Sequence, residues 1–215
     1  MDVAGLGLRF GAPIPLLRCP YCGVARPQML PVWSAGFVWG INDFPARMWG
    51  AFRCTSCGQI VLAGGYPGHN SQDAPIEEIY PGLRSAAEEL PEGARNYLQQ
   101  AYETLHAPDA AAVMAGSAVD AMLKARGYVE GSLYTRVDKA MADHVLTKEM
   151  GEWAHWVRLG SNRPRHADKD SPHVSPAEAQ QSVEFAQALG EFLFVLSSRI
   201  AAGIEKAKEP EISDP

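Results

Sequence analysis

Four cysteines form two pairs of identical spacing near the start of the chain. The first pair reads Cys19-Pro-Tyr-Cys22-Gly and the second reads Cys54-Thr-Ser-Cys57-Gly. Two intervening residues let both thiolates of a pair turn towards one ion, and the following glycine permits the tight turn. Two such pairs predict a closed site of four cysteines for a structural zinc ion, with no open coordination position for catalysis. The alternatives are a redox-active pair and an unliganded thiol cluster.

A cationic stretch, residues 157–166 (VRLGSNRPRH), holds the second set of residues that could do chemistry. Arg158, Asn162 and His166 follow one another at intervals of four, so a helix would place them on one face. Pro164 cannot sit deep inside a regular helix, which predicts either a kink or a new segment capped by Asn162. Both would expose backbone N–H groups that suit an anion.

Three roles are open for this stretch. The first is structural, because Arg, Asn and His at a helix end commonly satisfy carbonyls, and Asp168 and Asp170 are available as partners. The second is binding of a nucleic acid or nucleotide, with Arg163 and Arg165 as further phosphate contacts. The third is catalysis.

Composition places these residues in a globular chain with two different parts. Of 215 residues, 47% are hydrophobic and 20% charged, enough for a buried core. Residues 1–70 hold five Arg and two Asp, whereas residues 71–215 hold fourteen Lys or Arg and twenty-three acids, a balance of −9. The acidic total argues against a protein that coats nucleic acid. We read no secretory signal and no membrane-spanning run, so a cytoplasmic protein without a membrane partner is expected.

The element pattern changes along the chain. Residues 1–70 are rich in Gly, Pro and aromatic residues, and short strands are expected over 29–33, 36–41, 48–53 and 59–63. The aromatic side chains here are expected in the core of the small module, with stacking on nucleic-acid bases as the alternative. Helices are expected over 92–106, 110–126, 132–144, 147–159 and 175–202. The clearest start is Ser175-Pro176-Ala177-Glu178, and Asp109 and Gly127 are read as the cap and stop of the second helix. The predicted domains are a zinc-ribbon module (1–70), a linker (71–83), a helical bundle (84–206) and a frayed tail (207–215).

The helical part resembles a known bacterial family. Three segments carry the likeness: DAAAVMAGSAVDAML (109–123), VRLGSNRPRHADKD (157–170) and SPAEAQQSVEFAQALGEFLFVLSSRI (175–200). The most specific pattern is Arg158, Gly160, Asn162 and His166, followed by the Ser-Pro-Ala-Glu helix start. Over residues 78–202 the chain looks like the domain-of-unknown-function family 4145, within the wider HEPN group. An N-terminal zinc ribbon also resembles an arrangement in this family.

The resemblance implies a fold and a chemistry. HEPN domains are up-and-down helical bundles that commonly dimerise, and many are metal-independent ribonucleases in which a ribose 2′-hydroxyl attacks the adjacent phosphate. Carried onto this chain, His166 would move the proton, Arg158 would stabilise the charged phosphorane, and Asn162 would orient one of them.

The fold expected is therefore mainly α, an up-and-down HEPN-like helical bundle preceded by a small β-rich zinc ribbon. The function expected is a homodimer that engages RNA or another nucleic acid in a defence-type or accessory role, with ribonuclease activity if the site is catalytic. The alternative is a non-catalytic module for dimerisation and for binding a protein partner.

Overall fold

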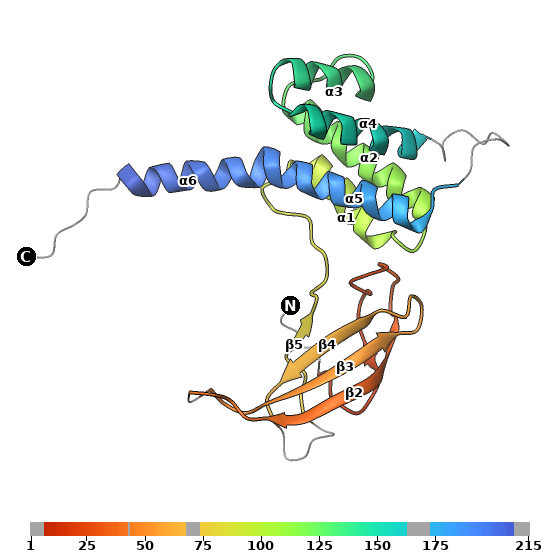
Figure 1. The fold of residues 1–215 in the computed structure, drawn as a ribbon, viewed down its shortest axis with the longest axis vertical. Helices are drawn as coiled ribbons and strands as arrows, with labels where there is room; N and C mark the ends of the chain where they lie inside the picture. The colour runs from red at the N-terminus through yellow and green to blue at the C-terminus, as the bar shows by residue number, and fades with distance from the viewer. Residues whose placement is uncertain (1–6, 43, 68–73, 163–172, 209–215) are drawn as a thin grey trace, which may run out of the picture. The chain divides into compact units, whose positions relative to one another are not determined.

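The computed structural model describes residues 7–42, 44–67, 74–162 and 173–208 (Figure 1). The chain divides into two compact units, residues 1–84 and residues 85–215, which we call the sheet unit and the helical unit. The sheet unit is a five-stranded antiparallel sheet whose strands lie in chain order. They are β1 (Ile14–Pro15), β2 (Gln28–Val38), β3 (Arg47–Cys54), β4 (Ile60–Gly65) and β5 (Glu78–Tyr80).

The expectation of a mainly α protein is wrong, because the N-terminal part is a full sheet unit with its own core. Met29, Met48 and Phe52 project from one face of the sheet and are buried with Ile14 and Ile79. A sheet with one apolar face must bury that face, and here the N-terminal segments cover it. The chain is therefore a mixed α/β protein, in which the β-rich N-terminal part fits the zinc-ribbon part of the expectation.

Two local features separate the observed strands from the expected ones. The expected strands 29–33 and 36–41 are one strand, β2, which stays paired with β3 through register shifts between Pro31 and Trp33 and between Ser34 and Gly36. Bulges of this kind absorb an extra residue without ending the strand. The other feature is β5, which pairs with β4 inside the segment expected to be a linker.

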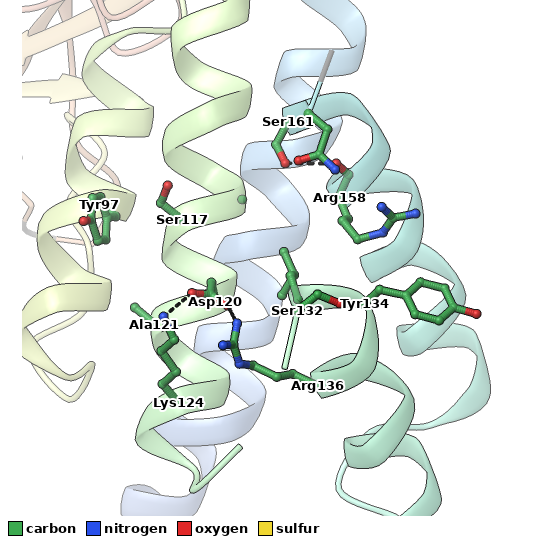
Figure 2. A pocket seen from close by; sticks show the side chains of 13 residues that line it. Tyr97, Ser117, Asp120, Ala121, Lys124, Ser132, Tyr134, Arg136, Arg158 and Ser161 are labelled. Atoms are coloured by element: carbon green, nitrogen blue, oxygen red, sulfur yellow. Dashed lines mark hydrogen bonds and ion pairs between the residues drawn. The ribbon is translucent and has the colours of Figure 1, made fainter. Parts of the chain in front are cut away.

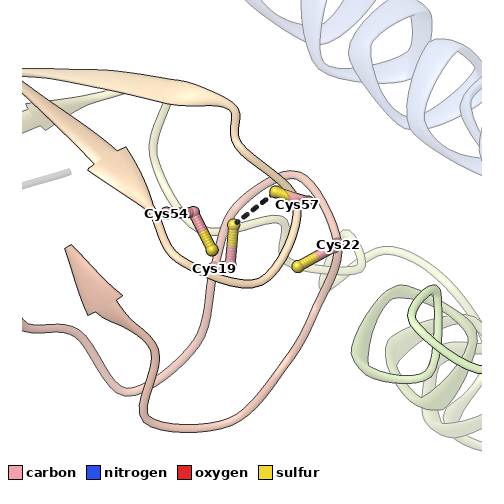
Figure 3. Close-up of side chains that lie close together, drawn as sticks. All are labelled: Cys19, Cys22, Cys54 and Cys57. Carbon is pink, nitrogen blue, oxygen red and sulfur yellow. Dashed lines mark hydrogen bonds between the residues drawn. The ribbon is translucent and has the colours of Figure 1, made fainter. Parts of the chain in front are cut away.

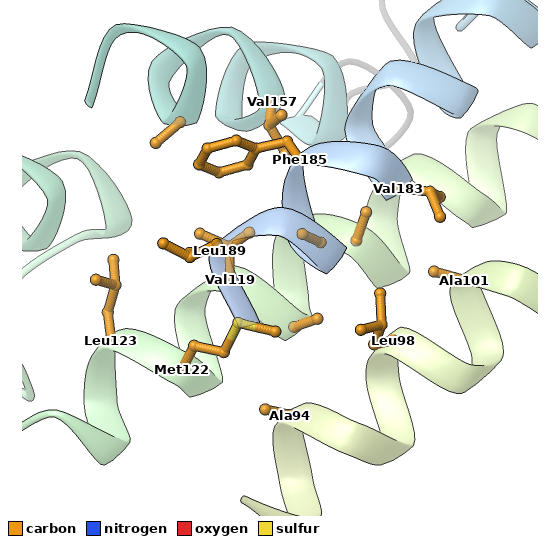
Figure 4. Packing of buried hydrophobic residues seen from close by; sticks show 14 of the residues in the cluster. Ala94, Leu98, Ala101, Val119, Met122, Leu123, Val157, Val183, Phe185 and Leu189 are labelled. Atoms are coloured by element: carbon orange, nitrogen blue, oxygen red, sulfur yellow. The ribbon is translucent and has the colours of Figure 1, made fainter. Parts of the chain in front are cut away.

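The helical unit contains α1 (Glu92–Glu103), α2 (Pro108–Ala125), α3 (Leu133–Ala142), α4 (Lys148–Asn162), α5 (Pro176–Gly190), the π-helix η3 (Glu191–Val195) and α6 (Leu196–Lys208). Helix α2 is central and packs against α1, α4 and α5. Its buried face includes Ala115, Ala118 and Val119, whose small side chains let the neighbouring helices approach closely. Figure 4 shows Val119 and Met122 of α2 packed with Phe185 and Leu189 of α5.

Most of the predicted helix signals act as expected. Ser175 and Glu178 form a complete capping box at the start of α5. Gly127 follows α2 with a φ of 95°, where a glycine avoids the steric strain of other residues. Asp109, however, is not the cap of α2. The helix begins at Pro108, and Asp109 instead accepts a hydrogen bond of 2.8 Å from the backbone N–H of Val174.

Helices α5, η3 and α6 form one continuous helix, Pro176–Lys208, which extends beyond the expected end at residue 202. Its length and composition alone would suffice to cross a membrane. In its first half, Val183, Phe185 and Leu189 are buried in the core of the helical unit. By contrast, α6 contributes no buried residue.

Candidate functional site

The four cysteines converge at one end of the sheet unit (Figure 3). Cys19 and Cys22 come from the loop between β1 and β2, Cys54 ends β3, and Cys57 lies in the turn before β4. All four sulfur atoms lie within 4.8 Å of one another, and none is in a disulfide. The Sγ atoms of Cys19 and Cys57 are 3.8 Å apart. A tetrahedral zinc ion with Zn–S bonds of about 2.3 Å needs sulfur atoms about 3.8 Å apart, so this donor set fits such an ion.

Both cysteine turns have the same backbone geometry. The N–H of Gly23 donates to the carbonyl of Cys19 at 3.0 Å, and the N–H of Gly58 donates to the carbonyl of Cys54 at 2.9 Å. Both glycines have a positive φ, which explains the glycine after each pair. Burial raises the pKa of the Cys19 thiol, although backbone hydrogen bonds from Cys22 and Tyr21 oppose it. The predicted grouping of the cysteines as a candidate metal site is confirmed, and zinc as the ion stays a prediction.

A polar pocket of about 400 Å³ lies in the helical unit, bordered by α2, α3 and α4 (Figure 2). The chemistry of its lining comes mainly from Asp120, Lys124, Arg136, Arg158, Ser161 and Asn162. Arg158 and Asn162 were singled out from the sequence, and the structure brings both to this pocket. They can both line it because α4 continues through Asn162 instead of ending near residue 159.

Asp120 is shared by two cations. Its Oδ1 lies 2.5 Å from Nη1 of Arg136, and its Oδ2 lies 2.7 Å from Nζ of Lys124. Arg136 also donates from Nη2 to the carbonyl of Val129 at 3.0 Å. One carboxylate against two cations leaves local positive charge. This cluster was not predicted from the sequence, although Asp120 and Lys124 lie four residues apart on a helix, a spacing typical of ion pairs.

Within the described part of the chain, Arg158 contacts an aromatic ring and no acid. Its guanidinium carbon lies 5.3 Å from the centre of the Tyr134 ring, and its Nε is buried without a hydrogen-bond partner among the described residues. The other neighbour of Tyr134 is His155, at 4.7 Å between ring centres, whose Nε2 lies 3.0 Å from Asp138 Oδ1. Tyr134 of α3 therefore contacts both Arg158 and His155, which lie one turn apart on α4. This contact positions the Arg158 side chain against α3.

The remaining predicted residues cannot be placed. Arg163, Arg165 and His166 lie outside the described residues, as do Asp168 and Asp170, the acids considered as partners. Whether His166 reaches the pocket therefore stays a prediction.

Comparison with known proteins bears on the helical unit. A family model described as "Domain of unknown function (DUF4145)" matches residues 99–207. The match begins in α1, ends in α6 and takes in nearly the whole lining of the polar pocket, whereas the cysteine cluster lies outside it. No curated protein and no solved structure shows significant similarity to the chain. Because the matched residues make up half of its length, the chain belongs to the DUF4145 family.

Proposed function

We propose that the helical unit engages RNA, or another nucleic acid, by holding a phosphate group in the polar pocket. The observation that supports this proposal most is the charge of the lining: among the described residues it holds Lys124, Arg136 and Arg158 and one carboxylate, Asp120, which pairs with the first two. Residues 71–215 have a balance of −9, so this concentration of cations is local. A local positive pocket on an acidic unit favours one captured anion over broad binding along a nucleic acid.

Arg158 is the residue best suited to contact that phosphate. A guanidinium offers a planar set of donors that matches two phosphate oxygens. The buried Nε of Arg158 lacks a partner among the described residues, and a buried donor left unpaired is unfavourable. Because this Nε atom is buried, a phosphate oxygen would supply the missing acceptor after a small shift of the Arg158 side chain. Asn162, four residues further along α4, lines the same pocket and offers an amide donor.

The resemblance to the HEPN group extends the proposal to metal-independent RNA cleavage. His166 would take the proton of a ribose 2′-hydroxyl as its oxygen attacks the adjacent phosphorus. The bond to the 5′ oxygen then breaks, and the proton is returned to that leaving oxygen. Arg158 would stabilise the phosphorane charge, and Arg163 and Arg165 would contact neighbouring phosphates. Such a protein would act in a defence-type or accessory role in a bacterial cytoplasm.

The test compares four full-length proteins on labelled single-stranded and structured RNA in a buffer without added divalent cations, which leaves the metal expected at the four cysteines in place. The proteins are the wild type, Arg158→Ala, His166→Ala and the control Lys148→Ala. Lys148 lies on the same helix as Arg158, but its side chain is 82% exposed and does not line the pocket. We expect Arg158→Ala to lose at least ten-fold in affinity and His166→Ala to bind without cleaving.

Two results would overturn parts of the proposal. An RNA affinity of Arg158→Ala equal to that of the wild type would show that the polar pocket does not hold a phosphate group. Equal cleavage by the wild type and His166→Ala would show that a contaminating nuclease cuts the RNA. The proposal of catalysis would then fail, and the proposal of RNA binding would still stand.

A second candidate function is that of a dimerisation module, and a different observation favours it. Phe192, Leu196, Ile200 and Ile204 follow one another every four residues, and each is 41–54% exposed. They form an apolar stripe that begins at Phe192 in η3 and continues along α6. A groove of about 850 Å³ between α4 and α5 is also apolar, with Trp153 and Trp156 in its lining. Its charged lining residues are the acids Glu178 and Glu184, whereas α6 carries Arg199, Lys206 and Lys208 with one acid, Glu205.

These two surfaces complement each other in polarity and charge, but α6 continues α5 and cannot fold back onto its own groove without breaking the helix. A second copy of the chain can supply the missing half, and reciprocal docking would close a two-fold dimer. The double variant Ile200→Ser/Ile204→Ser should then be monomeric by light scattering, and Ala202→Ser, on another face of α6, should not be. A dimer that persists in the double variant would exclude this arrangement.

A further inference from the structure

The outer face of the sheet, defined as the face opposite the buried Met48 and Phe52, is rich in exposed apolar side chains. Residues directly opposite each other on neighbouring strands share a face. One such row crosses four strands as Trp33, Ala51, Leu62 and Tyr80. Trp33 is 56% exposed, Leu62 43% and Tyr80 47%, so this row is open to solvent.

The next row places a third aromatic ring beside the first two. It reads Gly36, Trp49, Gly64 and Glu78 across the same strands. The Trp49 and Tyr80 ring centres are 6.3 Å apart. A side chain at Gly64 would approach the Trp49 ring to 2.9 Å, whereas the space around Gly36 is open. Glycine at position 64 therefore leaves room for the half-buried Trp49 ring to lie over the sheet beside the Tyr80 ring.

Arginines flank the aromatic rows at both ends. Arg47 lies one row beyond Trp49, with its guanidinium carbon 5.3 Å from the Trp49 ring centre, and forms an ion pair with Glu78. Arg53 lies on the other side, in the row of Leu30 and Ile60. It is exposed, and its side chain makes no hydrogen bond or ion pair with any described residue. The outer face therefore combines open rings with a cation that has no acidic partner in the described part of the chain.

We infer that the outer face of the sheet binds single-stranded nucleic acid, with bases stacked on Trp33, Trp49 and Tyr80 and a phosphate at Arg53. Every base has a π-face, and aromatic rings beside arginines provide contacts for bases and backbone together. The inference rests on the proposed function and names the form of its ligand. In a duplex the base faces are already stacked on one another, so the rings select a single strand.

The aromatic residues of this part divide between the core and the solvent-exposed surface, whereas the expectation placed them in the core. Trp33 and Trp39 are 56% and 81% exposed, whereas Phe52 is buried at 1%. Phe10 and Phe52 lie in the core with Ile14, Met29 and other aliphatic or sulfur-containing residues. The exposed rings are thus left free for the alternative use, stacking on bases.

The test measures binding of labelled oligouridine, and of a duplex of equal length, to the full-length protein. The double variant Trp33→Ala/Tyr80→Ala removes two stacking rings, and Trp33→Phe/Tyr80→Phe keeps both. Leu17→Ala is the control, since it removes a 66% exposed apolar side chain of the same unit outside the strands. We expect the alanine double variant to lose at least ten-fold in affinity for oligouridine, with smaller changes for the phenylalanine pair and the control. Wild type should bind the duplex more weakly than the single strand.

A parallel measurement on Arg158→Ala separates this inference from the proposed function. If the alanine double variant binds oligouridine as tightly as the wild type and Arg158→Ala binds it more weakly, the sheet does not bind the strand. The proposed phosphate site in the polar pocket would then still stand. Binding of neither RNA form by the wild type would overturn both. A loss of affinity in the alanine double variant but not in the phenylalanine double variant supports stacking. Both variants must have the metal content and the helical signal of the wild type. If the phenylalanine pair loses as much, the aromatic faces do not carry the binding and the inference fails.

Discussion

The side chain of Ser161 on α4 occupies the space that a side chain at Gly116 on α2 would need. A Cβ atom at position 116 would lie 2.6 Å from Oγ and 2.7 Å from Cβ of Ser161. Rotation of the hydroxyl cannot relieve the contact with Cβ, so the two helices would have to move apart. Ser161 also donates its hydroxyl to the carbonyl of Arg158 at 3.0 Å. The close approach of α2 and α4 therefore sets the place of Arg158 in the polar pocket.

We predict that Gly116→Ala lowers the free energy of unfolding by about 1–2 kcal/mol, because overpacking outweighs the better helix propensity of alanine. Denaturant titration measures this, and RNA affinity should fall with it. Gly93→Ala is the matched control, since Gly93 lies on α1 with open space around it. There the substitution should stabilise by about 0.5–1 kcal/mol. Stabilisation by both substitutions would contradict the close packing of α2 against α4.

Replacement of Cys54 by Ser should remove the metal and unfold the sheet unit. Metal analysis of freshly purified protein should give one zinc ion per wild-type chain and none for the variant. In small domains a structural zinc ion supplies much of the folding free energy, so a strong chelator should have the same effect on the wild type. The helical signal in circular dichroism should persist, because the helical unit has its own core. A wild-type protein purified without metal and with an intact sheet would refute this prediction.

A hydrogen bond to Glu78 raises the pKa of the Tyr80 hydroxyl, since ionisation would place a phenolate beside a carboxylate. The folded pKa lies above the unfolded one, so this contribution to stability is fully present below the unfolded pKa of about 10. It is lost as the pH rises through the folded pKa. Glu78→Gln should therefore shift the Tyr80 titration, followed by phenolate absorbance, to lower pH. A titration that does not move would show that Glu78 is not the cause.

Sequence patterns were sufficient to predict those local structures that depend only on a few consecutive residues. The capping box of Ser175 and Glu178 needs only four consecutive residues, and the two cysteine turns need five each. The strand β5 could not be read in the same way. It has three residues, it is followed directly by Pro81, and it lies at the edge of the sheet, paired with β4. A strand of that length is fixed by tertiary pairing, not by its own propensity.

The residues of the polar pocket also differ in how far they could be predicted from the sequence. Arg158 and Asn162 were predictable as neighbours, because a spacing of four residues on one helix places them together. Arg136 was not, since it reaches Asp120 from another helix, sixteen residues further along the chain. The exposure of Trp33 was equally hidden, because apolar composition does not say which face of a sheet is covered.

Asp120 is the residue whose removal tests the pocket most directly. Asp120→Asn would leave Arg136, with a side chain only 11% exposed, without its counter-charge. The pair is partly buried, so we expect a decrease of about 1–3 kcal/mol in the free energy of unfolding, between the values for exposed and fully buried pairs. An anion that binds only the folded state restores stability in proportion to its occupancy. Inorganic phosphate should therefore raise the melting temperature of this variant more than that of the wild type.

The control is Asp138→Asn, at an acid that pairs with His155 and has a 42% exposed side chain. An exposed pair contributes about 1 kcal/mol or less, so this variant should be nearly as stable as the wild type and no more sensitive to phosphate. Equal losses in the two variants would mean that Arg136 does not depend on Asp120. Equal phosphate shifts in Asp120→Asn and the wild type would mean that the freed cations do not bind an anion, and the pocket would then serve only to join α2 to α3.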